Sequence, residues 1–149
     1  TLMDNDRSQA LKSQPVDGLV TANINHPIGN FTSENIQFHD FPEGIFIDAK
    51  SNQGQRLMSF HLAKDIQPGS YDVAQEKGKV QVYYYHALGP NPWTYQPSSG
   101  KLRIWKIDLE HRHITATFSF TSHKVPKGEE PLKVTQGELN LPGLEPIID

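Results

Sequence analysis

The sequence contains no cysteine. This absence excludes disulfide bonds, thiolate catalysis and cysteine-based zinc sites, but it does not fix the compartment, because reduced cytosolic chains and many exported proteins manage without disulfides. The sequence also lacks an apolar run of the roughly 18 residues that a membrane-spanning helix needs, and it lacks a basic start followed by an apolar stretch. Because the chain begins at Thr1 rather than at Met, a removed signal or lipoprotein segment is left open.

An excess of basic charge is missing as well. The 14 basic and 17 acidic residues give a formal net charge of -3. A general binder of the phosphate backbone relies on clustered Lys and Arg, so we expect no nucleic-acid partner. The sequence has no glycine-rich phosphate-binding loop at the start of a helix, and it has no Gly-x-Ser-x-Gly motif that would indicate a serine nucleophile. We therefore expect a non-enzymatic protein without a cofactor.

What the chain does contain is alternation with a period of two residues. Apolar residues at every second position from Ile114 to Phe120 alternate with Thr and Ser, which is typical of a strand with one buried face. An apolar set ending at Ile104 and an offset set starting at Trp105 precede it, and an extended pattern resumes over 132–141. The stretch from Gly100 to Leu139 therefore predicts three consecutive antiparallel strands.

Similar patterns upstream bring the total to about nine strands, at 19–24, 31–39, 45–50, 56–62, 70–73, 79–86 and in the three-strand stretch. The segment 87–99 holds three prolines and is expected to be a loop. Residues 1–17 are polar and are expected to be a flexible leader, and residues 18–149 form a single domain. The predicted fold class is all-β, an antiparallel two-sheet β-sandwich that is immunoglobulin-like in the loose sense, with barrel closure left open.

Several short motifs between Leu19 and Leu141 carry a family resemblance. They are the run at 18–24, Pro-Gly-Ser-Tyr at 68–71, the runs at 100–108 and 114–120, and Val-Thr-Gln-Gly-Glu-Leu at 134–139. In these motifs the chain resembles small bacterial envelope proteins of unknown function, many of them lipoprotein-like with an immunoglobulin-like sandwich. The resemblance implies a location in the bacterial cell envelope or periplasm, with membrane attachment only through an N-terminal anchor. It implies no active site.

An aromatic set makes the best candidate binding site. Tyr83 and Tyr85 share one face of the strand at 79–86, and the following loop carries Trp93 and Tyr95. Exposed aromatic rings stack on sugars and anchor protein interfaces. The alternative is structural: Trp93 closes the open end of the core and the tyrosines cover a sheet edge.

The histidines raise a metal hypothesis, and His111 and His113 form the tightest pair. Two imidazoles two residues apart on a strand point to the same face and can share one Zn²⁺ or Cu²⁺. The pair lies at an expected hairpin corner, where polar residues are ordinarily solvated, and no third ligand is evident. We therefore predict no native metal site and keep His111 and His113 as weak candidates.

Three function hypotheses result. The first is an envelope binding module that recognises a protein or a glycan through Tyr83, Tyr85, Trp93 and Tyr95. The second is a structural protein that self-associates through exposed strand edges, with the strand at 79–86 as the seam, so that a homodimer is left open. The third, and the weakest, is a metal-dependent enzyme.

Overall fold

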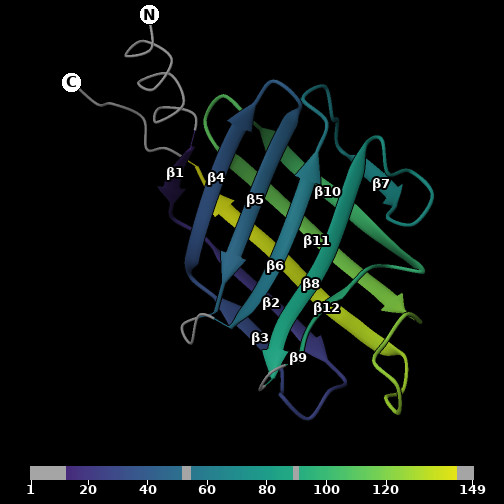
Figure 1. The fold of residues 1–149 in the computed structure, drawn as a ribbon. Helices are drawn as coiled ribbons and strands as arrows, with labels where there is room; N and C mark the ends of the chain where they lie inside the picture. Colours follow the sequence, from purple (N-terminus) through teal and green to yellow (C-terminus); the bar gives the residue numbers. More distant parts are fainter. Residues whose placement is uncertain (1–12, 52–54, 89–90, 144–149) are drawn as a thin grey trace, which may run out of the picture.

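The computed structural model describes residues 13–51, 55–88 and 91–143. Twelve strands and no helix are present within these residues, and the strands form two antiparallel sheets of six (Figure 1). None of this part of the chain forms a helix long and apolar enough to cross a membrane. The prediction of an all-β, two-sheet sandwich is confirmed, whereas the expected number of about nine strands is wrong.

The two sheets pack face to face with their strands crossing at an angle (Figure 1). The first sheet has the order β1 (Ser13–Val16), β4 (Asn35–Phe41), β5 (Gly44–Lys50), β6 (Arg56–Leu62), β8 (Val80–Leu88) and β9 (Asn91–Tyr95). The second has the order β3 (Phe31–Ser33), β2 (Leu19–Ile24), β12 (Leu132–Pro142), β11 (His113–Ser122), β10 (Ser99–Asp108) and β7 (Gly69–Asp72).

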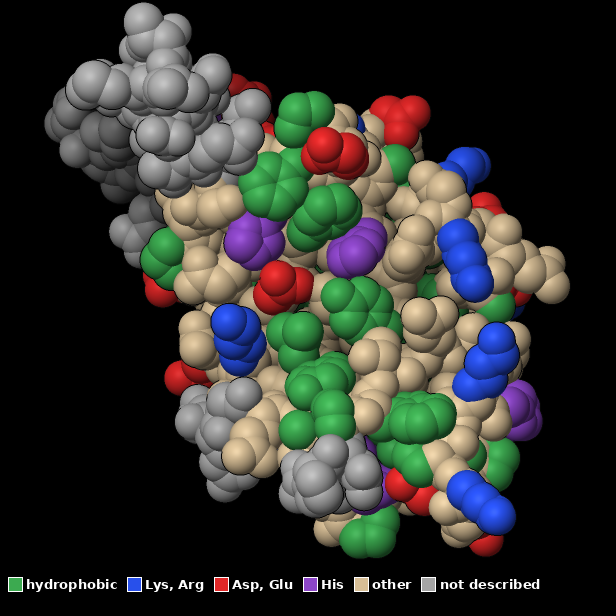
Figure 2. All heavy atoms as spheres, in the orientation of Figure 1, with side chains coloured by type: hydrophobic (Ala, Val, Ile, Leu, Met, Phe, Trp, Pro, Cys, Tyr) green, Lys and Arg blue, Asp and Glu red, His purple; other side chains and the backbone are tan. Residues whose placement is uncertain are grey.

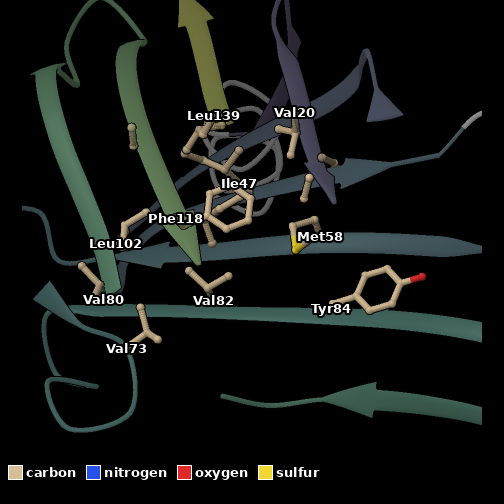
Figure 3. Packing of buried hydrophobic residues seen from close by; sticks show 14 of the residues in the cluster. Val20, Ile47, Met58, Val73, Val80, Val82, Tyr84, Leu102, Phe118 and Leu139 are labelled. Carbon is tan, nitrogen blue, oxygen red and sulfur yellow. The ribbon is translucent and has the colours of Figure 1, made fainter. Parts of the chain in front are cut away.

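One hydrophobic core fills the space between the sheets. Each strand contributes every second residue, as the alternation predicts: Ile114, Ala116, Phe118 and Phe120 on β11 are all at most 4% exposed. Phe60 of the first sheet meets Phe118 of the second edge to face, with ring centroids 5.1 Å apart. Figure 3 shows side chains of both sheets interdigitating, with Tyr84 at one side and its hydroxyl directed away from the aliphatic residues.

The predicted three-strand stretch is confirmed as β10, β11 and β12, which pair consecutively and antiparallel. The offset between the two apolar sets of β10 is a β-bulge, because the register shifts between Ile104 and Lys106. A second shift lies between Thr135 and Glu138 of β12, where Gln136 takes a φ of 50°. Both bulges add an outward-facing residue to the second sheet.

Three corrections account for the extra strands. The expected loop at 87–99 contains β9, and residues 13–16 of the expected leader form β1, while residues 1–12 lie outside the described residues. Pro92 and Pro15 are tolerated because β9 and β1 are the edges of the first sheet, where a missing N–H breaks no ladder. The expected strand at 31–39 is two strands, since the chain leaves the second sheet after Ser33 and enters the first at Asn35.

Candidate functional site

The outer face of the first sheet carries aromatic and imidazole side chains where an ordinary solvated face carries polar ones. Side chains alternate along each strand, so Phe46 of β5, His61 of β6 and Tyr83 of β8 point away from the core. All three are partly exposed. Figure 2 shows hydrophobic and histidine side chains gathered on this face, over the strands of the front sheet. We call this surface the aromatic face.

Its rings touch one another in a row that crosses four strands. Phe41 of β4 meets Phe46 edge to face at 5.7 Å between centroids, Phe46 meets His61 at 4.5 Å, and His61 meets Tyr83 edge to face at 5.5 Å. His39 stacks on Phe41 at one end. Mutual contacts of this kind fix the rings in place, so the aromatic face is a rigid surface before any partner arrives.

Charged and polar groups accompany the rings. His39 Nε2 lies 3.3 Å from Asp48 Oδ2, and Asp48 Oδ1 accepts a hydrogen bond from the Ser59 hydroxyl at 2.6 Å. Burial lowers the pKa of His61, and nearby Asp48 opposes that shift. His61 is therefore neutral at neutral pH and adds to the apolar character of the face.

A hollow of about 460 Å³ adjoins the row at Phe46 and His61. Its rim carries both signs of charge, and all of these residues are exposed: Lys64, Lys77, Lys79, Glu43 and Asp65. The aromatic face thus ends in a cavity with an aromatic wall and a rim of mixed charge.

The structure divides the four predicted binding residues between the two sides of the first sheet. Tyr83 and Tyr85 point outward and are partly exposed. Tyr95 pairs with Tyr84 across the ladder, faces the core and is fully buried. Trp93 pairs with His86 on the same inner side, is 36% exposed, and donates its indole N–H to the Lys124 carbonyl at 3.1 Å. A shared surface of all four is thus ruled out by the pleat, because Tyr85 lies opposite Thr94 rather than Trp93 or Tyr95.

The inward-facing members belong to a buried chain of hydrogen bonds at the end of the sandwich. Arg56 Nε donates to the Tyr84 hydroxyl at 2.8 Å, and that hydroxyl lies 3.0 Å from His86 Nδ1. On the other side of the imidazole, Nε2 lies 3.4 Å from the Tyr95 hydroxyl, which donates to Glu129 Oε1 at 2.7 Å. We call this sequence of five residues the polar chain.

The chemistry of its two ends sets the direction of every bond. A guanidinium only donates and an ionised carboxylate only accepts, so Tyr84 donates to His86 Nδ1 and His86 Nε2–H donates to Tyr95. His86 is consequently the neutral tautomer with its proton on Nε2. A second proton on Nδ1 would face the hydrogen of the Tyr84 hydroxyl, which Arg56 holds in that orientation.

The pKa values follow from this environment. Burial lowers the pKa of His86 to about 4, and the neighbouring His26 and Arg56 side chains act in the same direction while Glu129 opposes them. Burial raises the pKa of the Tyr95 hydroxyl, and its hydrogen bond to Glu129 raises it further. At neutral pH both groups keep the protonation states that the polar chain needs, so the chain is suited to holding structure in place rather than to moving protons.

The polar chain ties two loops to the sheet. Arg56 donates to the carbonyls of Gly29 and Asn30 at 2.7 and 3.0 Å, and its guanidinium lies over the rings of Phe31 and Tyr84. At the other end, Glu129 Oε1 lies 3.5 Å from His26 Nε2. A pocket of about 290 Å³ opens beside this contact, between the loops 25–27 and 128–132.

The predicted metal candidates do not share a strand face. His111 lies in the turn between β10 and β11, and His113 begins β11. Within the described residues, the ligand atoms that cluster with those of His111 belong to Asp108 and Glu110, and all three residues are exposed. His111 Nδ1 lies 2.8 Å from Asp108 Oδ2, which raises the pKa of His111 and lowers that of Asp108. The absence of a native metal site remains a prediction.

Comparison with known proteins found no matching family model, no significant match among curated proteins and none among solved structures.

Sequence reasoning missed Phe46, His61 and the polar chain. The outward positions of Phe46 and His61 were legible from alternation, because each sits between two apolar residues that face the core. The polar chain could not be predicted in this way, because Arg56, His86 and Glu129 lie far apart in the sequence and only strand pairing brings them together.

Proposed function

We propose that this protein is a non-enzymatic binding module that recognises a partner protein through the aromatic face. The observation that carries the proposal is the ring row from Phe41 to Tyr83 on the solvent side of a sheet whose other side is already packed on the core. An antiparallel sheet with one packed face ordinarily presents polar residues on the other. Aromatic residues fixed on an outer surface are the groups that supply most of the energy at protein interfaces.

The arrangement favours a protein over a glycan at this face. Stacking on a sugar needs a ring whose flat face is open, whereas Phe46, His61 and Tyr83 meet one another at their edges and faces and expose only part of each ring. The hollow beside Phe46 and His61 can take one apolar side chain, and its rim of lysines and carboxylates favours charged residues of both signs around that anchor. In this proposal Tyr83 and Tyr85 contact the partner, whereas Trp93 and Tyr95 stabilise the fold.

The proposal also includes a location in the cell envelope and an immunoglobulin-like type of β-sandwich. They depend on the sequence resemblance, and the two packed antiparallel sheets are compatible with it.

Self-association through strand edges has less support. The expected seam at 79–86 is β8, which pairs with β6 on one side and β9 on the other and so has no free edge. The edge strands β1, β9, β3 and β7 are five residues long or shorter, and short edges of this kind limit edge-to-edge pairing.

The test places a photo-crosslinking amino acid at Gln81, on the aromatic face, or at Thr115, on the outer face of the second sheet. We expect one protein of the cell envelope to crosslink from position 81 and not from position 115. Its affinity for the purified chain is then measured with the double variant Phe46→Ser, Tyr83→Ser and with the matched control Tyr83→Phe.

Loss of two hot-spot aromatics should weaken binding at least about 30-fold, since a single such residue contributes about 2 kcal/mol or more, which corresponds to that factor. The Tyr83→Phe control should bind as the unmodified chain does. Equal crosslinking from both positions, or unchanged affinity of the double variant, would contradict the proposal. Crosslinking of one copy to another from position 81, with a dimer in sedimentation analysis, would replace it by self-recognition through the same face.

A further inference from the structure

A shallow groove of about 850 Å³ lies on the outer face of the second sheet, on the side of the sandwich opposite the aromatic face. Its lining follows from the strand register. Arg103 of β10 pairs with Ser70 of β7 and with Thr117 of β11, Thr117 pairs with Glu138 of β12, and Glu138 pairs with Thr21 of β2. One row of side chains therefore crosses five strands and places a cation, hydroxyl groups and a carboxylate in line.

A second row runs beside the first. It contains Lys101 of β10, Ser119 of β11, Gln136 of β12 and Asn23 of β2. The bulge in β12 turns Gln136 outward, and the Asn23 side-chain amide donates to Gln136 Oε1 at 2.9 Å. This contact holds two amide groups in a fixed orientation, which lowers the cost of ordering them around a ligand.

An exposed tryptophan stands at the border of the groove. The bulge in β10 turns Trp105 outward, where it is 49% exposed. Its indole N–H donates to Thr117 Oγ1 at 3.1 Å, and the Arg103 guanidinium carbon lies 3.8 Å from its ring centroid. Two residues that line the groove thus fix the orientation of Trp105, a large apolar ring that the protein leaves half in solvent.

The chemistry of these groups matches a carbohydrate. Sugar rings present hydroxyl groups around their edge and C–H groups on their faces, so they pair with hydroxyl, amide and carboxylate side chains and stack on an aromatic ring. The volume lies within the range of about 300–1,000 Å³ that small-ligand sites span, and the open shape suits a chain of sugars.

The charge of the groove selects the kind of sugar. Lys101 and Arg103 are exposed, and neither forms an ion pair with another residue of the described part of the chain. With Glu138 as the one lining carboxylate, the lining is net positive in a protein whose formal net charge is -3. A guanidinium pairs with a carboxylate through two parallel hydrogen bonds.

We propose that this groove binds an acidic, uronate-containing oligosaccharide. Arg103 and Lys101 contact its carboxylate, and Glu138 and the Asn23–Gln136 pair contact its hydroxyl groups. The solvent-exposed part of Trp105, away from the face that the Arg103 guanidinium covers, lies against a sugar ring. This site is separate from the aromatic face, and the two proposals stand or fall independently.

The test is isothermal titration calorimetry of the purified chain with tetrasaccharides of galacturonate, mannuronate and glucuronate, and with the neutral tetrasaccharide of glucose as a matched ligand. Variants Arg103→Gln and Trp105→Ala remove the cation and the ring. Lys50→Gln removes an exposed cation on the outer side of the other sheet and serves as the control. Thermal unfolding of each variant confirms that it is folded, and Trp105→Phe supplies a second variant of the ring.

We expect at least one acidic tetrasaccharide to bind, with affinity that falls as salt rises. Arg103→Gln and Trp105→Ala should each weaken binding at least tenfold, Trp105→Phe should weaken it less, and Lys50→Gln should leave it unchanged. The double variant Phe46→Ser, Tyr83→Ser should bind the sugar normally.

Three outcomes would overturn the proposal. They are binding of none of the acidic tetrasaccharides at millimolar concentration, equal binding of the neutral tetrasaccharide with no effect of Arg103→Gln, and binding of inorganic phosphate with the same affinity as the sugar.

Discussion

Lowering the pH should destabilise this protein through His86. The imidazole is 2% exposed, and its Nδ1 accepts from the Tyr84 hydroxyl while its Nε2–H donates to Tyr95. Burial, with a smaller contribution from the neighbouring His26 and Arg56 side chains, lowers its pKa from 6.5 to about 4. The unfolded chain therefore takes up a proton on His86 below about pH 6.5, whereas the folded protein takes it up only near pH 4. Since the unfolded state binds more protons across this interval, the free energy of unfolding falls as the pH falls.

The size of the effect follows from the size of the pKa shift. A tenfold change in proton affinity corresponds to about 1.4 kcal/mol, so lowering the pKa of His86 from 6.5 to about 4 corresponds to roughly 3–4 kcal/mol at most. Glu129, at the solvent end of the polar chain, is partly exposed, and screening there reduces the effect. We expect a loss of about 2 kcal/mol between pH 6.5 and pH 4 that is attributable to His86.

The measurement is urea unfolding at a series of pH values from 7.5 to 4, for the unmodified chain and for His86→Gln. Other groups also titrate: the lowered pKa of His61 adds to the acid loss, and the paired His111 and Asp108 contribute as well. These contributions are common to both proteins and cancel in the difference. His86→Gln should be less stable at pH 7.5, because its neighbours lose hydrogen bonds, and its stability should depend less on pH. Parallel curves for the two proteins between pH 6.5 and 4 would refute the reasoning.

Two further predictions concern stability. Trp93→Ala should lower the free energy of unfolding by about 1–2 kcal/mol, because the side chain is 36% exposed and makes one hydrogen bond, to the Lys124 carbonyl. Removing a fully buried aromatic side chain costs roughly 3–5 kcal/mol. A loss above about 4 kcal/mol in urea unfolding would therefore show that Trp93 closes the core. Gly100→Ala should cost more than about 2 kcal/mol, because Gly100 has a φ of 141° and an added Cβ would collide with the backbone of Ser119 and Phe120. Gly78→Ala, whose Cβ would meet open space, is its control and should change stability little in the same assay.

The fold class could be predicted because strand alternation is a local property. The alternation of residue types predicts which side of each strand is buried, as in 114–120 and 45–49. The structure buries those sides. The β10 bulge was also visible in the sequence, because the apolar residues change from even to odd positions at Trp105. Edge strands were harder to predict, because Pro15 and Pro92 indicate breaks in a strand. Only the strand order shows that both prolines lie on edge strands, β1 and β9, where they are tolerated.

The candidate sites were also predictable only in part. The sequence alone predicts that Tyr83 and Tyr85 share one face, because successive side chains of a strand point to opposite faces. Their neighbours depend on which strands pair and in what register. This pairing places Phe46 and His61 next to Tyr83, and it directs Tyr95 into the core. Tertiary structure alone joined Arg56 to Glu129 through His86, and the pairing register of β10, β11 and β12 placed Arg103 in line with Glu138. Contacts between strands distant in the chain are set by global packing, and no local pattern encodes them.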